Sequence, residues 1–298
     1  MKAGRIIALC FCILLAGKAL SQVRDSIPLI VADSLKAVYI YADTGRALNQ
    51  VDAQGRKKGL WEKRYPNGKL RYRGHFKEGN PNGVFKYYWN NDSIQNIAIY
   101  SNGGKVAYSR FFYENGGVFS TGKFVSEKRD SIWLFYDESW KLCKKEQYSN
   151  GKKEGKSITF YGNGTVLESK TYHNDVENGP WQQYFENGHL KLETNYVNGK
   201  REGSIKIYDE SNPDRPSVQG SYIHDMMNGP WVYYNKIDDR WDTIVYKNDK
   251  PVNQSKYGFS QHKLDSMKAK NQDVQHNLDH PSMQDLNYKK QDPRDGGN

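Results

Sequence analysis

The chain has 298 residues, of which 37% are hydrophobic, 13% aromatic and 26% charged, and its formal net charge is +10 at pH 7. This apolar share is compatible with a folded protein, and 22 Tyr, 11 Phe and 7 Trp beside 27 Gly favour strands and tight turns over helices. Two of the three cysteines lie in the N-terminal apolar run, so the rest of the chain is excluded from forming an internal disulfide or a cysteine-based metal cluster.

The first 21 residues have the pattern of a secretory signal peptide. Lys2 and Arg5 precede an apolar run at residues 6–16, and the small-x-small site at residues 19–21 would leave Gln22 as the first mature residue. A membrane anchor is the alternative, but eleven apolar residues are too short for about 30 Å of hydrocarbon at roughly 1.5 Å per residue. No cysteine stands at a lipoprotein-type cleavage position. We therefore expect export to the periplasm or the cell exterior, and a net charge that falls from +10 to +7 with the leader.

A short linker is expected at residues 22–34, and a repeat follows at residues 35–253. Its opening positions recur every 24 residues and then once after 26: Gly59, Gly83, Ala107, Ser131, Gly155, Gly179, Gly203 and Gly229. The two additional residues predict an enlarged loop at residues 211–217, where prolines and polar side chains gather. Residues 35–58 resemble a degenerate first copy that would cap the array.

Each unit has the pattern of a strand, a tight turn, a second strand and another tight turn. An aromatic residue follows the opening position by two in most copies, and an aromatic cluster such as Tyr184-Phe185 ends the first strand. Turn residues that tolerate positive φ come next, for example Asn187-Gly188, and a second turn such as Asn198-Gly199 leads to the next copy. In the second strand, even spacing places a pair such as Leu190 and Tyr196 on one face.

A period of this length with one supersecondary unit per period indicates a repeat array. We expect an all-β fold, namely an elongated, curved, single-layer antiparallel meander of about eight β-hairpin repeats. Aromatic rings of adjacent units would stack on one another, and glycines would leave room for them. The polar segment at residues 254–298 is expected to be a disordered or weakly helical tail.

The unit at residues 179–190, GPWQQYFENGHL, resembles the bacterial variant of the MORN repeat, and the resemblance extends over about residues 35–250. The copies that open at Ala107 and Ser131 depart most from it. Such proteins are often labelled YwqK-like antitoxins, which implies that they bind a partner protein without catalysis. Members with a signal peptide resemble surface or periplasmic proteins of the Bacteroidetes type, and for these a cytoplasmic antitoxin role is in doubt.

A search for catalytic and metal-binding motifs predicts no catalytic residue, no cofactor and no metal ligand. The seven histidines form no H-E-x-x-H motif, and neither a phosphate-binding loop nor a G-x-S-x-G elbow is present. Cys143 is expected to be a passive small residue in a strand. Carboxylates such as Glu186 and Glu193 are plentiful, but no pair stands out for glycoside hydrolysis, and an active site assembled by folding stays open.

Four tryptophans recur at the same place in their units and are the candidate binding residues: Trp61, Trp133, Trp181 and Trp231. They could form aromatic platforms along one edge, for sugars, peptides or lipid interfaces. The alternative is that they pack between hairpins, which explains all four with a single cause. The same reasoning makes irregular copies of the repeat better candidates for binding.

Three functions remain as hypotheses from the sequence. The first is a non-catalytic scaffold that binds a protein or an envelope surface outside the cytoplasm, with end-to-end homodimers possible through unpaired strand edges. The second is an antitoxin-like or immunity-like protein that neutralises a toxin by direct binding. The third is an enzyme that acts on cell-wall glycan. Because the chain is expected to be exported, no nucleic-acid partner is expected, and no transmembrane segment is expected in the mature chain.

Overall fold

The computed structural model describes residues 47–236 and 239–252, and β-strands are the only regular secondary-structure elements in these ranges. The chain divides into two compact units, residues 1–217 and 218–298. The predicted all-β antiparallel meander is confirmed. Among the residues described, no helix is long and apolar enough to cross a membrane. The expected signal peptide and linker, residues 35–46 of the first copy, and the tail at residues 254–298 lie outside the described residues.

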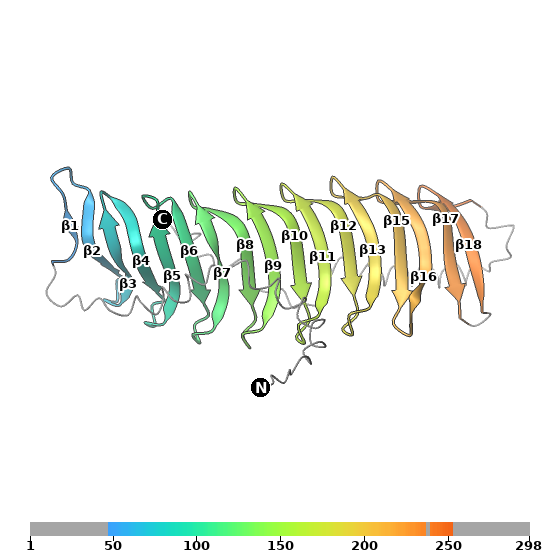
Figure 1. Ribbon diagram of the computed structural model, residues 1–298, viewed down its shortest axis with the longest axis horizontal. Coiled ribbons are helices and arrows are strands. Elements are labelled where there is room, and N and C mark those ends of the chain that lie inside the picture. The colour runs from blue at the N-terminus through green and yellow to red at the C-terminus, as the bar shows by residue number, and fades with distance from the viewer. Residues whose placement is uncertain (1–46, 237–238, 253–298) are drawn as a thin grey trace, which may run out of the picture. The chain divides into compact units, whose positions relative to one another are not determined.

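The first unit is a meander in which each strand pairs antiparallel with the next strand of the chain (Figure 1). Its strands are β1 (Gln50–Val51), β2 (Lys57–Arg64), β3 (Leu70–Lys77), β4 (Asn80–Tyr88), β5 (Ile94–Ser101), β6 (Val106–Phe112), β7 (Val118–Val125), β8 (Lys128–Tyr136), β9 (Leu142–Ser149), β10 (Lys152–Phe160), β11 (Val166–His173), β12 (Val176–Tyr184), β13 (Leu190–Val197), β14 (Lys200–Arg201) and β15 (Gly203–Asp209). The last two form one interrupted strand, since both pair with β13.

The second unit continues the same pattern in four strands. They are the C-terminal part of β16 (Asn212–Ile223), β17 (Met226–Asn235), β18 (Arg240–Lys247) and β19 (Lys250–Pro251). The enlarged loop expected at residues 211–217 is wrong, because β16 already begins at Asn212 and runs for 12 residues. The two additional residues lengthen this strand. Pro213 and Pro216 fit there because the φ angle of proline is compatible with an extended backbone.

In the first turns that contain Asn-Gly, the asparagine and the glycine have different roles. In the turn at residues 65–69, Gly68 has φ +83°, whereas Asn67 keeps an ordinary φ and its Oδ1 accepts the Lys69 N–H at 3.1 Å. Asn163 makes the equivalent bond to Thr165 at 2.9 Å. Only the glycine therefore supplies the left-handed conformation that the turn needs, and the asparagine closes the turn with its side chain.

The opening glycine marks a β-bulge rather than a packing contact. Gly83 has φ +71°, and the pairing of β3 with β4 shifts register opposite it. Ser131 adopts φ +61° and keeps the bulge, so this divergent copy folds like the others. The copy at Ala107 differs, because β5 and β6 pair without a shift and the extra residue enters a turn with positive φ at Asn102, Gly103 and Gly104.

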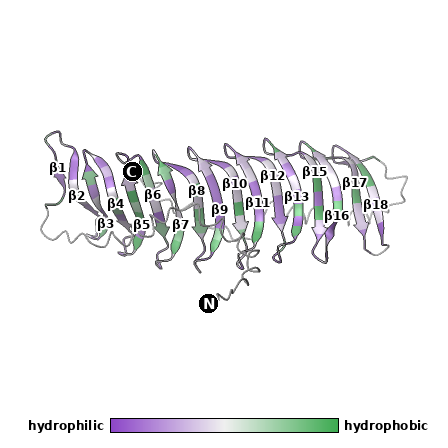
Figure 2. Cartoon of the chain, viewed as in Figure 1, coloured by the Kyte–Doolittle hydropathy of each residue, from purple (hydrophilic) through white to green (hydrophobic). Residues whose placement is uncertain are grey.

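Within each unit, one face of the sheet carries most of the buried side chains, and we call it the inner face. Figure 2 shows hydrophobic and hydrophilic bands alternating along the strands, as expected for a sheet with two different faces. Phe85 and Trp133 of the first unit and Trp231 of the second lie on it and are at most 1% exposed. The opposite face, the second face, carries half-buried side chains such as Tyr88 and Tyr136.

Candidate functional site

The four tryptophans predicted as a binding surface lie mainly inside the packing of the inner face. Trp133, Trp181 and Trp231 are 0%, 1% and 1% exposed, so these three rings present no surface to a ligand. Trp61 is half-buried, and its Nε1 donates to the carbonyls of Gln50 at 3.0 Å and Lys58 at 3.2 Å. The alternative interpretation, packing between hairpins, accounts for their positions.

Glycine on the neighbouring strand makes this packing possible. A Cβ built on Gly122 would lie 2.2 Å from Trp133 Cδ2, and one on Gly220 would lie 2.1 Å from the same atom of Trp231. Each ring thus rests directly on a backbone that has no side chain. Phe124 contacts the Trp133 ring edge-on at 4.8 Å between centroids, and the Arg129 guanidinium lies 4.8 Å from the ring centroid. The expectation that glycines leave room for stacked rings is confirmed.

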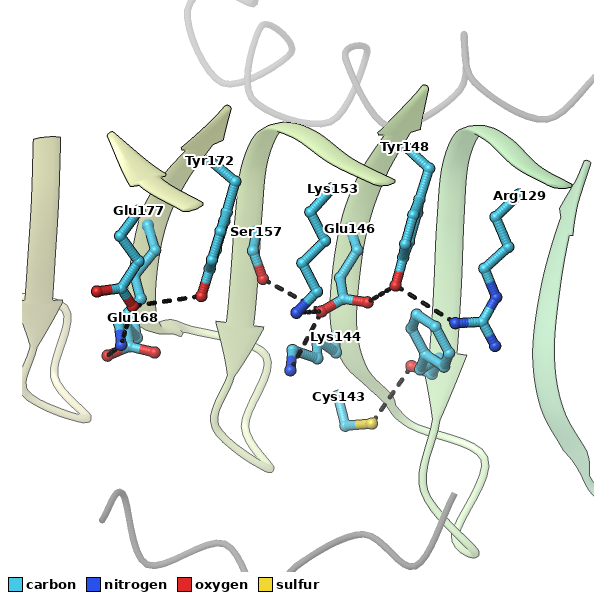
Figure 3. A network of polar contacts seen from close by, with 12 residues as sticks. Arg129, Cys143, Lys144, Glu146, Tyr148, Lys153, Ser157, Glu168, Tyr172 and Glu177 are labelled. Atoms are coloured by element: carbon cyan, nitrogen blue, oxygen red, sulfur yellow. Dashed lines mark hydrogen bonds and ion pairs between the residues drawn. The ribbon is translucent and has the colours of Figure 1, made fainter. Parts of the chain in front are cut away.

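Ser157 stands at the position that tryptophan occupies in other units. The inner face contains a charged network there. Glu146 occupies the position opposite Ser157 and is only 2% exposed. Its Oε1 lies 2.8 Å from Lys153 Nζ and 3.3 Å from Lys144 Nζ, and its Oε2 accepts the Tyr148 hydroxyl at 2.5 Å (Figure 3). A carboxylate with two ammonium partners therefore fills the space that a ring fills in other units.

Electrostatics keep this carboxylate ionised. Burial alone would raise the pKa of Glu146, but Lys144, Lys153 and the hydrogen bond from Tyr148 outweigh it and hold the pKa at about 2. Burial and the adjacent Glu146 charge raise the pKa of Tyr148 well above its ordinary value. Because Glu146 is ionised and Tyr148 neutral near pH 7, neither group gains or loses a proton readily there, and the network is suited to holding strands together.

A second charged cluster continues the network on β11 and β12. Glu168 Oε1 accepts the Trp181 Nε1–H at 2.8 Å, and Lys170 Nζ lies 4.9 Å from the centroid of the same ring. Lys170 also forms an ion pair with Glu177 at 3.0 Å, and Glu177 accepts the Tyr172 hydroxyl at 3.4 Å (Figure 3). These contacts combine ion pairs with an indole. This part of the inner face is therefore intermediate between the ring packing at Trp133 and the charged network at Glu146.

The remaining residues considered for chemistry are accounted for by ordinary contacts. Cys143 is buried at a bulge, its Sγ lies 3.4 Å from the Phe135 carbonyl, and burial raises the pKa of its thiol to about 11. His173 Nδ1 lies 2.9 Å from Glu154 Oε1. No group of three or more His, Cys, Asp or Glu side chains within the described ranges could hold a metal ion. His262, His276 and His280 fall outside these ranges.

The second face carries a row of side chains that the sequence analysis did not select. One aromatic residue per hairpin stands at the end of the first strand, half-buried in each case: Tyr88, Phe112, Tyr136, Phe160, Tyr184 and Tyr208. We call this set the aromatic row. Where the sequence shows an aromatic pair, as in Tyr184-Phe185, the member of the row is the first residue of the pair. Their odd spacing from the buried rings, three positions earlier at Phe85, Trp133 and Trp181, was the available signal for a separate face.

Trp140 is the second feature that the sequence analysis missed. It lies in the turn at residues 137–141, is 68% exposed, and has φ +66°. Corresponding turns have glycine at this place, as in Gly116 and Gly164. An alignment of the repeats shows this exception directly, because Trp140 is out of phase with the four recurrent tryptophans.

Comparison with known proteins supports the repeat assignment. Three segments match the family model described as the MORN repeat variant: residues 57–78, 153–174 and 177–198. Their starts are 96 and 24 residues apart, which are multiples of the predicted period. The chain thus contains MORN-type repeats at three places. No curated protein matches the chain.

The solved structures found by similarity are distant. A crystal structure of TarM is 14% identical with a TM-score of 0.26, and the match covers 54% of this chain and 25% of that one. The Tc holotoxin pore of Photorhabdus luminescens is 11% identical with a TM-score of 0.20, covering 67% of this chain and 14% of that one. The matches span a quarter or less of these proteins, and at these scores neither likeness bears on fold or function.

Proposed function

We propose that this protein is a non-catalytic repeat scaffold that binds another protein, or an envelope surface, outside the cytoplasm. The single observation that carries the proposal is the aromatic row of the first unit. It repeats one half-buried ring per 24 residues on one face of an antiparallel meander. Because successive members lie on every second strand, rings recur about every 10 Å along the sheet.

A row of this kind suits an extended partner. Half-exposed tyrosines supply large contact areas with few rotatable bonds, and a hydroxyl that can adapt to polar groups. The row lies beside charged side chains of the same face, for example Lys206 and Glu193, which are 3.0 Å apart. Aromatic groups flanked by charges are typical of protein interfaces.

The test is a pull-down from the native envelope fraction with residues 22–298, compared with residues 22–253, followed by mass spectrometry. A double variant, Tyr136→Thr with Tyr184→Thr, removes two members of the row. Their backbone carbonyls, which accept the hydroxyls of Tyr113 and Tyr161, remain. The matched control is Val176→Thr with Val197→Thr, which changes exposed side chains outside the row. Matching thermal unfolding curves would establish that all variants fold.

We expect one specific protein partner to be captured by the wild type and the control and lost by the double variant. Capture of a toxin that the chain then neutralises would favour the antitoxin-like alternative over the scaffold. Recovery of no protein, together with binding to isolated glycan or lipid, would overturn the protein-partner proposal. Release of sugar fragments from purified cell wall would instead favour the glycan-active enzyme.

Location outside the cytoplasm rests on the leader-like residues 1–21. N-terminal sequencing of the protein from its native cells should begin at Gln22 if the leader is removed as proposed. A chain that retains Met1 and stays in the cytoplasmic fraction would contradict this part.

A further inference from the structure

The turn at residues 137–141 departs from the other first turns in where its aromatic residue stands. In five of them an aromatic residue takes the first position: Tyr65, Trp89, Tyr113, Tyr161 and Phe185. Here Asp137 takes that position, and its Oδ1 accepts the N–H groups of Ser139 and Lys141, each at 2.9 Å. The aromatic residue is Trp140, at the fourth position, and it faces solvent.

The neighbouring turn is adapted to hold the indole of Trp140. A Cβ on Gly117 would lie 2.3 Å from Trp140 Nε1, so the indole lies directly against the backbone of the preceding hairpin. The corresponding residues of other turns have side chains: Lys69, Ser93, Lys141, Thr165 and His189. Trp140 and Gly117, which are the exceptions at their positions in two adjacent units, therefore act together. They fix a bulky residue in a left-handed conformation that such residues rarely adopt, and they leave the ring accessible.

Within the first unit, the first turns also carry a charge opposite to that of the whole chain. Seven carboxylates lie in them against only Lys69 and Lys141: Asp92, Glu114, Asp137, Glu138, Glu186, Asp209 and Glu210. The second turns of the same unit carry five lysines and three carboxylates, and the formal net charge of the chain is +10. Glu138 is exposed two residues from Trp140, and Glu114 is exposed on the adjacent turn, which also contains Gly117.

We infer that Trp140, with Glu138 and Glu114, binds a lysine or arginine side chain of the partner protein. An exposed indole attracts a cation over its face, and nearby carboxylates add an electrostatic attraction that a neutral platform lacks. Tryptophan is also the residue type most enriched among interface residues that dominate affinity. The inference rests on the proposed protein-binding function and specifies the chemistry of the partner.

The test measures binding of an octalysine peptide to residues 22–298 by calorimetry at low salt. Trp140→Gly gives the turn the residue that corresponding turns already have, so we expect it to fold, with no change in charge. Binding should weaken about fivefold to tenfold. The matched control is Val197→Gly, an exposed apolar residue at the end of β13, which should bind like the wild type.

Charge is tested with Glu138→Gln against Glu186→Gln, a carboxylate in a first turn two hairpins further along the chain. The first variant should weaken octalysine binding at least threefold more than the second. Equal binding by wild type and Trp140→Gly, or equal losses in the two glutamine variants, would overturn the inference, because attraction would then be diffuse and independent of the indole.

Failure of this inference can be told apart from failure of the scaffold proposal. If Trp140→Gly still captures the native partner at wild-type level, the cation site is wrong while the scaffold stands. If the wild type captures no protein but octalysine binding depends on Trp140, the scaffold proposal fails while the cation-binding site itself is supported.

Discussion

Two neighbouring segments of the first unit fill the same row of the inner face in opposite ways. In the ring segment, β3 to β8, Phe85 lies on Gly74 and Trp133 lies on Gly122. In the charged segment, β9 to β12, Glu146 lies opposite Ser157, with Lys144 and Lys153 as its ion partners. The backbone pairing is that of the same hairpin array in both.

The difference shows that side chains of neighbouring strands fill a similar volume in the two segments, although the types of residue that fill it differ. In the ring segment a large ring lies over a glycine of the preceding strand, whereas Ser157 leaves space for a long side chain opposite it. In the charged segment this side chain is ionised, so its burial is stabilising only while both lysines remain beside it. The ring segment depends on shape, and the charged segment depends on charge balance.

The largest effect is expected from Glu146→Ala in the charged segment. The change removes the partner of Lys144 and Lys153 and leaves a cavity beside Tyr148, and we expect it to lower the free energy of unfolding by about 3 kcal/mol. Urea denaturation followed by tryptophan fluorescence measures the loss. Glu186→Ala, in an exposed turn, should change stability by less than about 0.5 kcal/mol. Similar losses in the two variants would show that the buried network contributes little.

The charged segment should also make stability depend on acid pH. The pKa of Glu146 is about 2 in the folded chain against an ordinary value of 4.5. Because the folded value is depressed, this contribution is present above about pH 4.5 and is lost as the pH falls towards 2, on the order of 3 kcal/mol in total. Denaturation midpoints across this range measure it. Glu146→Gln should flatten the dependence, and an unchanged slope in that variant would assign the acid sensitivity to other groups.

In the ring segment, Gly122→Ala should cost about 2 kcal/mol, because the new methyl group would meet Trp133 at 2.2 Å and must displace it. Gly162→Ala is the matched control, since nothing lies within 4 Å of its Cβ position and its φ is not in the left-handed region. Thermal unfolding of both variants gives the comparison. If the Gly122 variant were as stable as the control, the ring would not be held in place by its glycine.

These segments also show how much of the molecule could be predicted from sequence. Hairpins follow from local signals, namely the aromatic spacing and turns such as Asn187-Gly188, and those predictions are confirmed. The pairing of Trp133 with Gly122 depends on the bulge at Ser131, which sets the register between strands and has no strong signal in a single copy. This is why the tryptophans could be read as a binding surface.

The charged network was harder to predict, because a glutamate within a β-strand is ordinarily exposed. Glu146 is buried because Ser157, eleven residues later, is small, and only a comparison of copies reveals that relation. Similarly, Pro213 and Pro216 indicated a loop from local preference, although the extended pairing of β16 accommodates them. Local rules therefore located the turns, while contacts between strands determined what is buried.

A double-mutant cycle can convert the charged segment into the ring type. Ser157→Trp alone should be destabilising, because the indole would overlap Glu146, whereas Ser157→Trp with Glu146→Gly recreates the pair seen at Gly122 and Trp133. We expect a favourable coupling of about 1–2 kcal/mol between the two substitutions. Urea denaturation of the wild type, both single variants and the double variant gives this value. Strict additivity would mean that the two positions do not share one space.

The smallest effect concerns a feature that the two segments share. Tyr113 in the ring segment donates its hydroxyl to the Tyr136 carbonyl at 2.9 Å, and Tyr161 in the charged segment donates to the Tyr184 carbonyl at 2.8 Å. Each bond joins adjacent hairpins at the first turn, so Tyr113→Phe and Tyr161→Phe should each cost about 1 kcal/mol. Tyr208→Phe is the control, because its hydroxyl makes only a 3.4 Å contact with Glu193. Equal losses for Tyr113 and Tyr161 would confine the difference between the segments to the inner face. Unequal losses would mean that the way a hairpin fills its inner face also changes how firmly it is joined to the next one.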